Sequence, residues 1–148
     1  MRIALAADHA GYQLKDELLA WLREAGQEVI DLGTNGPESV DYPQFGARLA
    51  DAVANGEAER GIVVCGSGIG ISIAVNRNPA CRCARVSEPL SAGLAREHND
   101  ANVLALGARL VGSDMAKACV NAFLGTEFAG GRHQRRVDQL SHLLQDSD

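Results

Sequence analysis

Residues 62–75 place a cysteine beside a glycine-rich turn, and this combination could support proton transfer or nucleophilic chemistry. An apolar run at residues 62–64 leads into Cys65, and Gly66, Gly68 and Gly70 follow at alternate positions before a helix-like segment at 71–75. Such a turn presents backbone N–H groups at a helix N-terminus, where a negative charge is favoured. The same field is expected to favour the thiolate of Cys65. The alternative is a buried structural cysteine beside a tight turn.

The spacing of the glycines does not match the common nucleotide-binding loops. In the dinucleotide pattern GxGxxG the third glycine would fall on Ile71, and no Gly-Lys-Ser/Thr follows as in a Walker loop. We therefore expect the backbone of the loop to hold an oxyanion or a sugar oxygen. That cradle consists of Gly66, Ser67, Gly68, Ile69 and Gly70.

Two arginines near the C-terminus could bind phosphate. Arg132 and Arg136 are four residues apart, so a helix would place them on one face. Two like charges at this spacing repel by roughly 0.2–0.5 kcal/mol, and a phosphate between them would turn the repulsion into attraction. The alternative is a solvated basic face that also includes Arg135.

Two histidines are candidates for moving protons near neutral pH. His9 follows the first apolar run, and His98 begins His98-Asn99-Asp100 at the end of a predicted helix. Each could instead be an ordinary polar loop or helix-end residue. His133 and His142 are expected at the surface.

The other cysteines do not form a recognisable metal site. Cys81 and Cys83 have one residue between them, which is too close for the usual zinc spacing, and no second pair follows. We expect no metal and no cofactor, and we expect Cys81, Cys83 and Cys119 to be packing residues. A thiol redox pair of Cys81 and Cys83 is the alternative.

The elements needed to position these residues alternate along the chain. Short apolar runs at residues 3–7, 29–32, 61–64, 82–86 and 103–106 predict strands. Helical spacing or start signals predict helices near 14–25, 41–53, 71–75, 87–100, 113–125 and 132–144, with Ser87 and Ser113-Asp114 as caps. This alternation predicts an α/β fold, a Rossmann-like three-layer α/β/α sandwich with a mostly parallel five-stranded sheet. In such folds ligands bind at the carboxyl ends of the strands, where Asp8-His9, Cys65–Gly70 and Gly107–Arg109 would meet.

Size and charge limit the classes of partner. The chain has 148 residues, which suits one domain over 1–148, and a net charge of −5, which argues against nucleic acid. No apolar run approaches the ~20 residues of a membrane span, and Met1-Arg2-Ile3 leads straight into a strand without signal-peptide features. We expect a cytoplasmic protein with free thiols.

Taken together, six short motifs resemble those of the ribose-5-phosphate isomerase type B family, within the wider group that includes the galactose-6-phosphate isomerase subunits. They occur in order along nearly the whole chain: Asp8-His9-Ala10-Gly11, Asp41-Tyr42-Pro43, Cys65–Gly70, Ser87-Glu88-Pro89, His98-Asn99-Asp100 and Gly130-Gly131-Arg132-His133. The resemblance implies interconversion of ribose 5-phosphate and ribulose 5-phosphate through an enediolate, as in the pentose phosphate pathway.

The resemblance also implies roles for individual residues. Cys65 would be the base, His98 would assist ring opening, and the glycine loop would hold the enediolate oxygen. Asp8 and Asn99 would bind sugar oxygens, and the phosphate would be surrounded by His9, Arg109, Arg132 and Arg136. The family builds its site from two subunits, so it implies a homodimer or tetramer in which the helix at about 132–144 reaches a partner.

Two departures and several alternatives remain open. Ile71 stands where one branch of the family has a carboxylate, and the stretch Arg82-Cys83-Ala84-Arg85 is less apolar than expected, which could alter a subunit contact. The substrate could be another sugar phosphate, such as allose 6-phosphate, galactose 6-phosphate or a tetrose phosphate. A non-catalytic module that binds a nucleotide or another phospho-ligand is a more distant alternative.

Overall fold

The sheet is built from apolar runs that lie at its centre. The computed structural model describes residues 1–143, and its five strands are all parallel in the order β2-β1-β3-β5-β4. Ile3, Ala4 and Leu5 are fully buried, as are Ile62, Val63 and Val64, because helices cover both faces of the sheet. The strands are β1 (Arg2–Ala7), β2 (Glu28–Asp31), β3 (Arg60–Cys65), β4 (Cys83–Arg85) and β5 (Val103–Gly107). The predicted α/β fold is confirmed, with a sheet that is parallel throughout.

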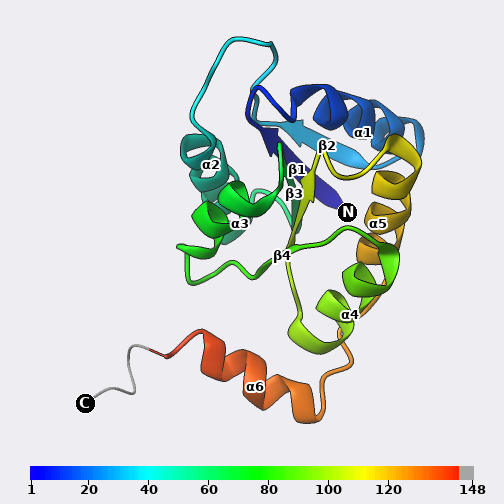
Figure 1. Cartoon of the computed structure of the whole chain (residues 1–148). Helices are drawn as coiled ribbons and strands as arrows, with labels where there is room; N and C mark the ends of the chain where they lie inside the picture. Colours follow the sequence, from blue (N-terminus) through cyan, green and yellow to red (C-terminus); the bar gives the residue numbers. More distant parts are fainter. Residues whose placement is uncertain (144–148) are drawn as a thin grey trace.

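The helices form two outer layers (Figure 1). One core packs helices α1, α4 and α5 against one face of the sheet, and a second core packs α2 and α3 against the other. The helices are α1 (Tyr12–Glu24), α2 (Tyr42–Ala54), α3 (Ile69–Asn76), α4 (Pro89–Asn99), α5 (Ser113–Gly125) and α6 (Arg132–Leu140). No helix within residues 1–143 combines the length and apolar character that crossing a membrane requires.

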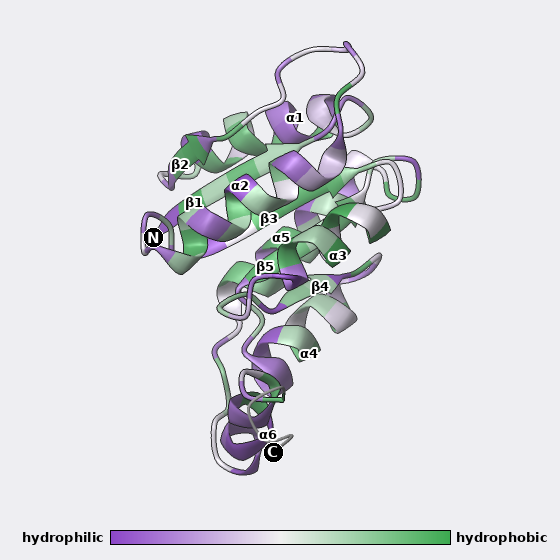
Figure 2. Ribbon diagram, turned by 90° about the vertical axis from the view of Figure 1, so that its left-hand side faces the viewer, coloured by the Kyte–Doolittle hydropathy of each residue, from purple (hydrophilic) through white to green (hydrophobic). Residues whose placement is uncertain are grey.

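Helix α6 differs from the others because it projects from the three-layered body and packs on α4 (Figure 1). Figure 2 shows it largely in hydrophilic colours, whereas the strands are largely hydrophobic. Val137 is its one buried residue within the described chain. The predicted helix at 132–144 therefore ends at Leu140, and residue 144 lies outside the described residues.

Two predicted helix caps are wrong. The residue that caps α4 is Glu88 rather than Ser87, because its carboxylate accepts the Ser91 N–H at 3.0 and 3.1 Å. The Ser91 hydroxyl also donates to this carboxylate, and this bond first, followed by those from the Ser91 N–H, holds the pKa of Glu88 below its ordinary value. At α5 the N-cap residue is Gly112, and Ser113 is already helical. Both helices nevertheless begin where the sequence predicts.

The sheet order creates a crevice between β1 and β3. The chain leaves β1 into α1 on one face and leaves β3 into α3 on the other, although the two strands are hydrogen-bonded neighbours. At such a point the two loops diverge, and a ligand can lie between them.

Candidate active site

A pocket of about 520 Å³ opens at the carboxyl ends of β1, β3 and β5. Its walls come from the loop after β1, the glycine loop after β3, the start of α2 and the loop after β5. The lining residues are Asp8, His9, Ala10, Tyr42, Cys65, Gly66, Ser67, Ile69, Gly70, Arg109 and Leu110.

Cys65 ends β3 and reaches this pocket although it is only 5% exposed. Its sulfur accepts the backbone N–H of Gly68 at 3.1 Å. Gly68 is the N-cap residue of α3 and has φ +76°, a left-handed conformation in which an L side chain is strained. The turn thus aims an N–H donor at the sulfur, and such a donor stabilises negative charge on it.

The glycine loop packs tightly against the end of β5. A Cβ on Gly107 would lie 2.6 Å from the Ser67 carbonyl oxygen, and a Cβ on Gly68 would lie 2.8 Å from the Leu106 carbonyl carbon. Glycine at both positions therefore allows the loop to approach the strand closely. The loop is held further by the backbone N–H of Arg109, which donates to the Gly66 carbonyl at 3.0 Å.

Asp8 and His9 enter the pocket from the loop after β1. Asp8 Oδ1 accepts the N–H groups of Ala10 and Gly11 at 3.0 and 3.1 Å, which fixes the turn into α1. His9 Nδ1 lies 3.1 Å from the Val40 nitrogen and 3.2 Å from the Val40 carbonyl oxygen, so it accepts from the N–H in one tautomer and donates to the carbonyl in the other. Both side chains are therefore held from behind before a ligand arrives.

The segment that carries Val40 is anchored by a buried lysine. Lys15 is fully buried, and its Nζ donates to Asp31 at 2.7 Å and to Asn35 at 2.9 Å. Asp31 also accepts the N–H of Gly33 at 2.9 Å. A buried charge is tolerated when it is paired and hydrogen-bonded in this way, and removing one partner is costly. Lys15 thus supports His9 indirectly, through the 32–41 segment.

A second group of polar side chains gathers where α4 ends against α6. We call His98, Asn99, Arg132, His133 and Arg136 the histidine–arginine cluster. The rings of His98 and His133 stack at 4.6 Å between centroids, with 16° between their planes. His133 is thus half-buried rather than simply a surface residue as predicted, while His142 is exposed. Partial desolvation and the positive charges of His98, Arg132 and Arg136 lower the pKa of His133 below its ordinary value.

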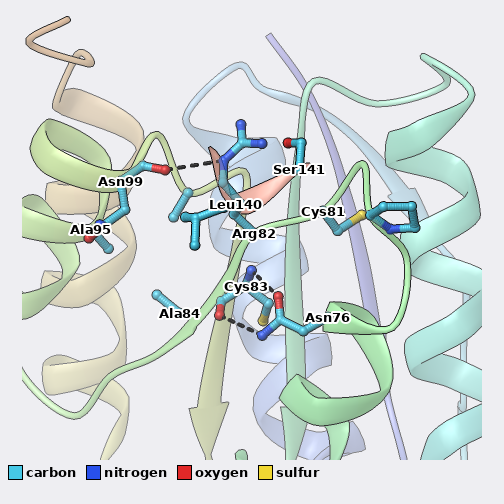
Figure 3. Close-up of a pocket in the computed structure, with 11 residues that line it drawn as sticks. Asn76, Cys81, Arg82, Cys83, Ala84, Ala95, Asn99, Leu140 and Ser141 are labelled. Atoms are coloured by element: carbon cyan, nitrogen blue, oxygen red, sulfur yellow. Dashed lines mark hydrogen bonds between the residues drawn. The ribbon is translucent and has the colours of Figure 1, made fainter. Parts of the chain in front are cut away.

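Asn99 borders a separate cavity of about 340 Å³ between β4, α4 and the end of α6 (Figure 3). Arg82 lies beside it and donates from Nε to the Asn99 carbonyl at 3.1 Å and to the Asp100 carbonyl at 3.0 Å. Asp100 also pairs with Arg96 at 2.8 Å. These bonds fix the C-terminal end of α4, on which His98 and Asn99 lie.

The same cavity contains Cys81 and Cys83, which were the candidate redox pair. Burial raises the pKa of Cys81 to about 11, and burial together with the neighbouring Cys81 raises the pKa of Cys83 further. Thiol exchange requires a thiolate, so both residues are poor redox centres near neutral pH. Within the described part of the chain, no group of three or more histidine, cysteine, aspartate or glutamate side chains is placed to hold a metal ion.

The structure therefore divides the predicted residues between two places. The strand-end pocket brings together Asp8, His9, Cys65, Arg109 and the glycine loop, with Gly68 supporting it from behind. The histidine–arginine cluster lies at the far end of α4, which runs back from the carboxyl edge of the sheet (Figure 1). Helix α4 has eleven residues and is roughly 16 Å long.

Sequence reasoning did not assign Tyr42 and Leu110 to the pocket. Tyr42 was interpreted as part of a helix start and of a family motif but not as a pocket residue, yet its ring lies 2.7 Å from where a Cβ of Gly70 would be. The contact between Tyr42 and a glycine of the loop follows from the packing of α2 on α3, which is not visible in either motif alone. Leu110 is 55% exposed at the rim, directly after the predicted segment Gly107–Arg109.

Comparisons with known proteins agree on one family. The family model described as Ribose/Galactose Isomerase matches residues 3–140. The chain is 50% identical to "Ribose-5-phosphate isomerase B" of Escherichia coli (strain K12), over 97% of each chain. It is 50% identical to a solved Clostridium thermocellum ribose-5-phosphate isomerase B, with full coverage of both chains and a TM-score of 0.97.

A solved Mycoplasma genitalium ribose-5-phosphate isomerase B with bound ribulose-5-phosphate is 37% identical to this chain. The match covers 99% of this chain and 97% of that one, with a TM-score of 0.92.

Proposed function

Because the chain belongs to the ribose/galactose isomerase family, we propose that it is an aldose–ketose isomerase that interconverts ribose 5-phosphate and ribulose 5-phosphate. The observation that carries the chemical assignment is the Cys65 sulfur in the strand-end pocket, with the Gly68 N–H directed at it at 3.1 Å. A base beside a preorganised set of N–H donors is what proton transfer next to a carbonyl requires.

The proton transfer proceeds on the open-chain sugar. The Cys65 thiolate removes the proton from C2 of ribose 5-phosphate, and the electron pair forms the C1=C2 bond while negative charge develops on O1. The backbone N–H groups of the glycine loop and of the first turn of α3 stabilise this enediolate. The Cys65 thiol then returns the proton to C1, the O2 hydroxyl proton passes to O1, and C2 becomes the carbonyl of ribulose 5-phosphate.

Substrate binding uses groups of both polarities. Asp8 accepts hydrogen bonds from sugar hydroxyls, and Asn99 offers both a donor and an acceptor. The phosphate is bound by His9, Arg109, Arg132 and Arg136, because arginine donates paired, charged hydrogen bonds to phosphate. His98 assists ring opening, in which a proton leaves the C1 hydroxyl and another reaches the ring oxygen.

We also infer that the complete site forms between two copies of the chain. Cys65 lies at the carboxyl end of β3, whereas the histidine–arginine cluster lies at the C-terminal end of α4, a helix of roughly 16 Å, and none of the cluster's residues lines the pocket that holds the thiol. α6 projects from the body and presents Arg132 and Arg136 on an exposed surface, where a neighbouring copy can meet them (Figure 1). In a two-fold dimer each copy would complete the other's pocket.

A direct rate comparison tests the substrate assignment. Purified protein is assayed with ribose 5-phosphate, allose 6-phosphate and galactose 6-phosphate at equal concentrations. We expect kcat/KM to be at least about tenfold higher for ribose 5-phosphate, because a pocket shaped for one sugar rejects a longer one by contacts worth ~1–3 kcal/mol. A higher kcat/KM with a six-carbon sugar phosphate would leave the proposed mechanism in place but show that ribose 5-phosphate is not the preferred substrate. Absence of turnover with all three would refute the isomerase assignment.

A further inference from the structure

The peptide unit between Ser67 and Gly68 is hydrogen-bonded at both of its ends. Its N–H, on Gly68, donates to the Cys65 sulfur at 3.1 Å. Its carbonyl, on Ser67, accepts the Nε–H of Arg85 at 3.0 Å. Because a peptide unit is planar, holding the carbonyl in place also holds the N–H in place.

Arg85 reaches this carbonyl from outside the pocket. It is the last residue of β4, at the edge of the sheet, and it pairs in register with Ala105 of β5. At the end of β5, the strand between β3 and β4, Gly107 leaves room for the Ser67 carbonyl. The arginine is exposed and does not belong to the residues that line the pocket.

A guanidinium at this carbonyl affects the sulfur in two ways. A charged donor polarises the peptide and strengthens its N–H as a donor to the thiolate. The bond also opposes rotation of the peptide, which the glycine at position 68 would otherwise permit and which would turn the carbonyl oxygen toward the sulfur.

We infer that Arg85 is a positioning residue for Cys65 and acts through the Ser67–Gly68 peptide; the inference rests on the proposed role of Cys65 as the base. The other titratable or charged groups around the thiol are Asp8, His9, Tyr42 and Arg109, which share the pocket itself. Arg85 acts from behind the loop, so its loss should change the thiol and the rate rather than substrate binding.

The test compares Arg85→Met and Arg85→Lys with the control Arg23→Met. Arg23 is an exposed arginine in the last turn of α1, at the opposite edge of the sheet, so its loss removes the same charge far from the site. The measurements are kcat, KM, and the pH profile of iodoacetamide alkylation at Cys65, followed on the Cys65 peptide by mass spectrometry. A Cys65→Ser protein provides the blank.

For Arg85→Met we expect kcat to fall about fivefold, which lies in the lower part of the range for members of one hydrogen-bonded network. The KM should stay within about twofold, and the alkylation midpoint should rise by about half a pH unit because the thiolate loses support. Arg85→Lys should lie between Arg85→Met and the unchanged protein, because it keeps a charged donor.

The inference is overturned if Arg85→Met matches Arg23→Met in both kcat and alkylation profile, or if only KM changes. Failure of the proposed function gives a different result. In that case the unchanged protein does not isomerise ribose 5-phosphate, or Cys65→Ser remains active, while the alkylation profiles still report whether Arg85 acts on Cys65.

Discussion

The strand-end pocket and the histidine–arginine cluster carry complementary chemistry on very different supports. Cys65 ends a buried central strand, and its loop is pressed against β5 so closely that Gly107 and Gly68 accept no side chain without a clash. Arg132 and Arg136 are exposed on α6, which projects from the body and packs on α4. A catalytic base must be positioned to within a fraction of an ångström, whereas a phosphate can be bound by the long side chains of arginine residues. Under the proposed function, proton transfer takes place on a buried and closely packed part of the fold, and two of the four proposed phosphate ligands, Arg132 and Arg136, lie on its exposed periphery.

The largest expected effect comes from removing the base. We expect Cys65→Ala to lower kcat about 10³-fold, within the range of 10²–10⁴ for loss of a positioned base, and to leave KM nearly unchanged. Steady-state kinetics with ribose 5-phosphate provide the measurement. A kcat near that of the unchanged protein would show that Cys65 is not the base and that the strand-end pocket does not carry out proton transfer.

Removing an arginine of the histidine–arginine cluster should change KM rather than kcat. We expect Arg136→Ala to raise KM for ribose 5-phosphate about 10- to 100-fold, because a hydrogen bond to a charged group contributes ~1.5–3 kcal/mol. Inhibition by inorganic phosphate should weaken in parallel. Arg135→Ala, on the same helix, is the matched control and should have little effect. An unchanged KM in Arg136→Ala would show that the cluster does not bind phosphate.

Substitution of Gly68 tests whether the tight packing of the glycine loop supports both stability and the position of the N–H donor. Gly68→Ala forces a side chain at φ +76° and within 2.8 Å of the Leu106 backbone. We expect it to lower the free energy of unfolding by ~1–3 kcal/mol, the usual cost of a strained backbone, and to reduce kcat by displacing the N–H donor. Gly112→Ala is the control, because a Cβ there meets nothing within 4 Å. Equal urea unfolding curves for the two variants would contradict the tight packing of the loop.

The smallest effect concerns the titration of His133. Its pKa is lowered first by partial desolvation and then by His98, Arg132 and Arg136, while Glu97 acts in the opposite direction. Arg136→Ala removes one of the positive charges, so the pKa of His133 should move up toward its ordinary value. Bound phosphate should move it in the same direction, because an anion favours the imidazolium. NMR titration of the histidine ring protons measures the effect of the substitution and of phosphate. A pKa of His133 that changes in neither case would show that these arginines are too far from His133 to affect it.

The strand-end half of the site was predictable because it depends on short stretches of chain. Apolar runs identify the strands, and Asp8, His9 and Cys65 follow two of them directly, so a parallel sheet brings their loops together. Tyr42 was missed because its place in the pocket depends on how α2 packs on α3. The contact of Arg85 with Ser67 spans 18 positions and depends on the order β3-β5-β4, which neither segment encodes locally.

The other half was identified by motif but could not be joined to the first from sequence patterns. His98 and His133 come together through the packing of α6 on α4, after a loop rich in glycine. In the proposed shared site, the relation of this cluster to Cys65 depends on how two chains associate. Spacing along one chain carries no direct information about that association.

Complementation between two inactive variants tests the shared site most directly. Cys65→Ala lacks the base, and the double variant Arg132→Ala/Arg136→Ala lacks two phosphate-binding arginines. Each variant alone should therefore be nearly inactive at low substrate concentration. When the two chains are co-expressed and assemble at random, half of the dimers should be mixed, and each mixed dimer holds one intact site. The account predicts recovery of about a quarter of the unchanged rate. A mixture no more active than its components would contradict a site built from two chains.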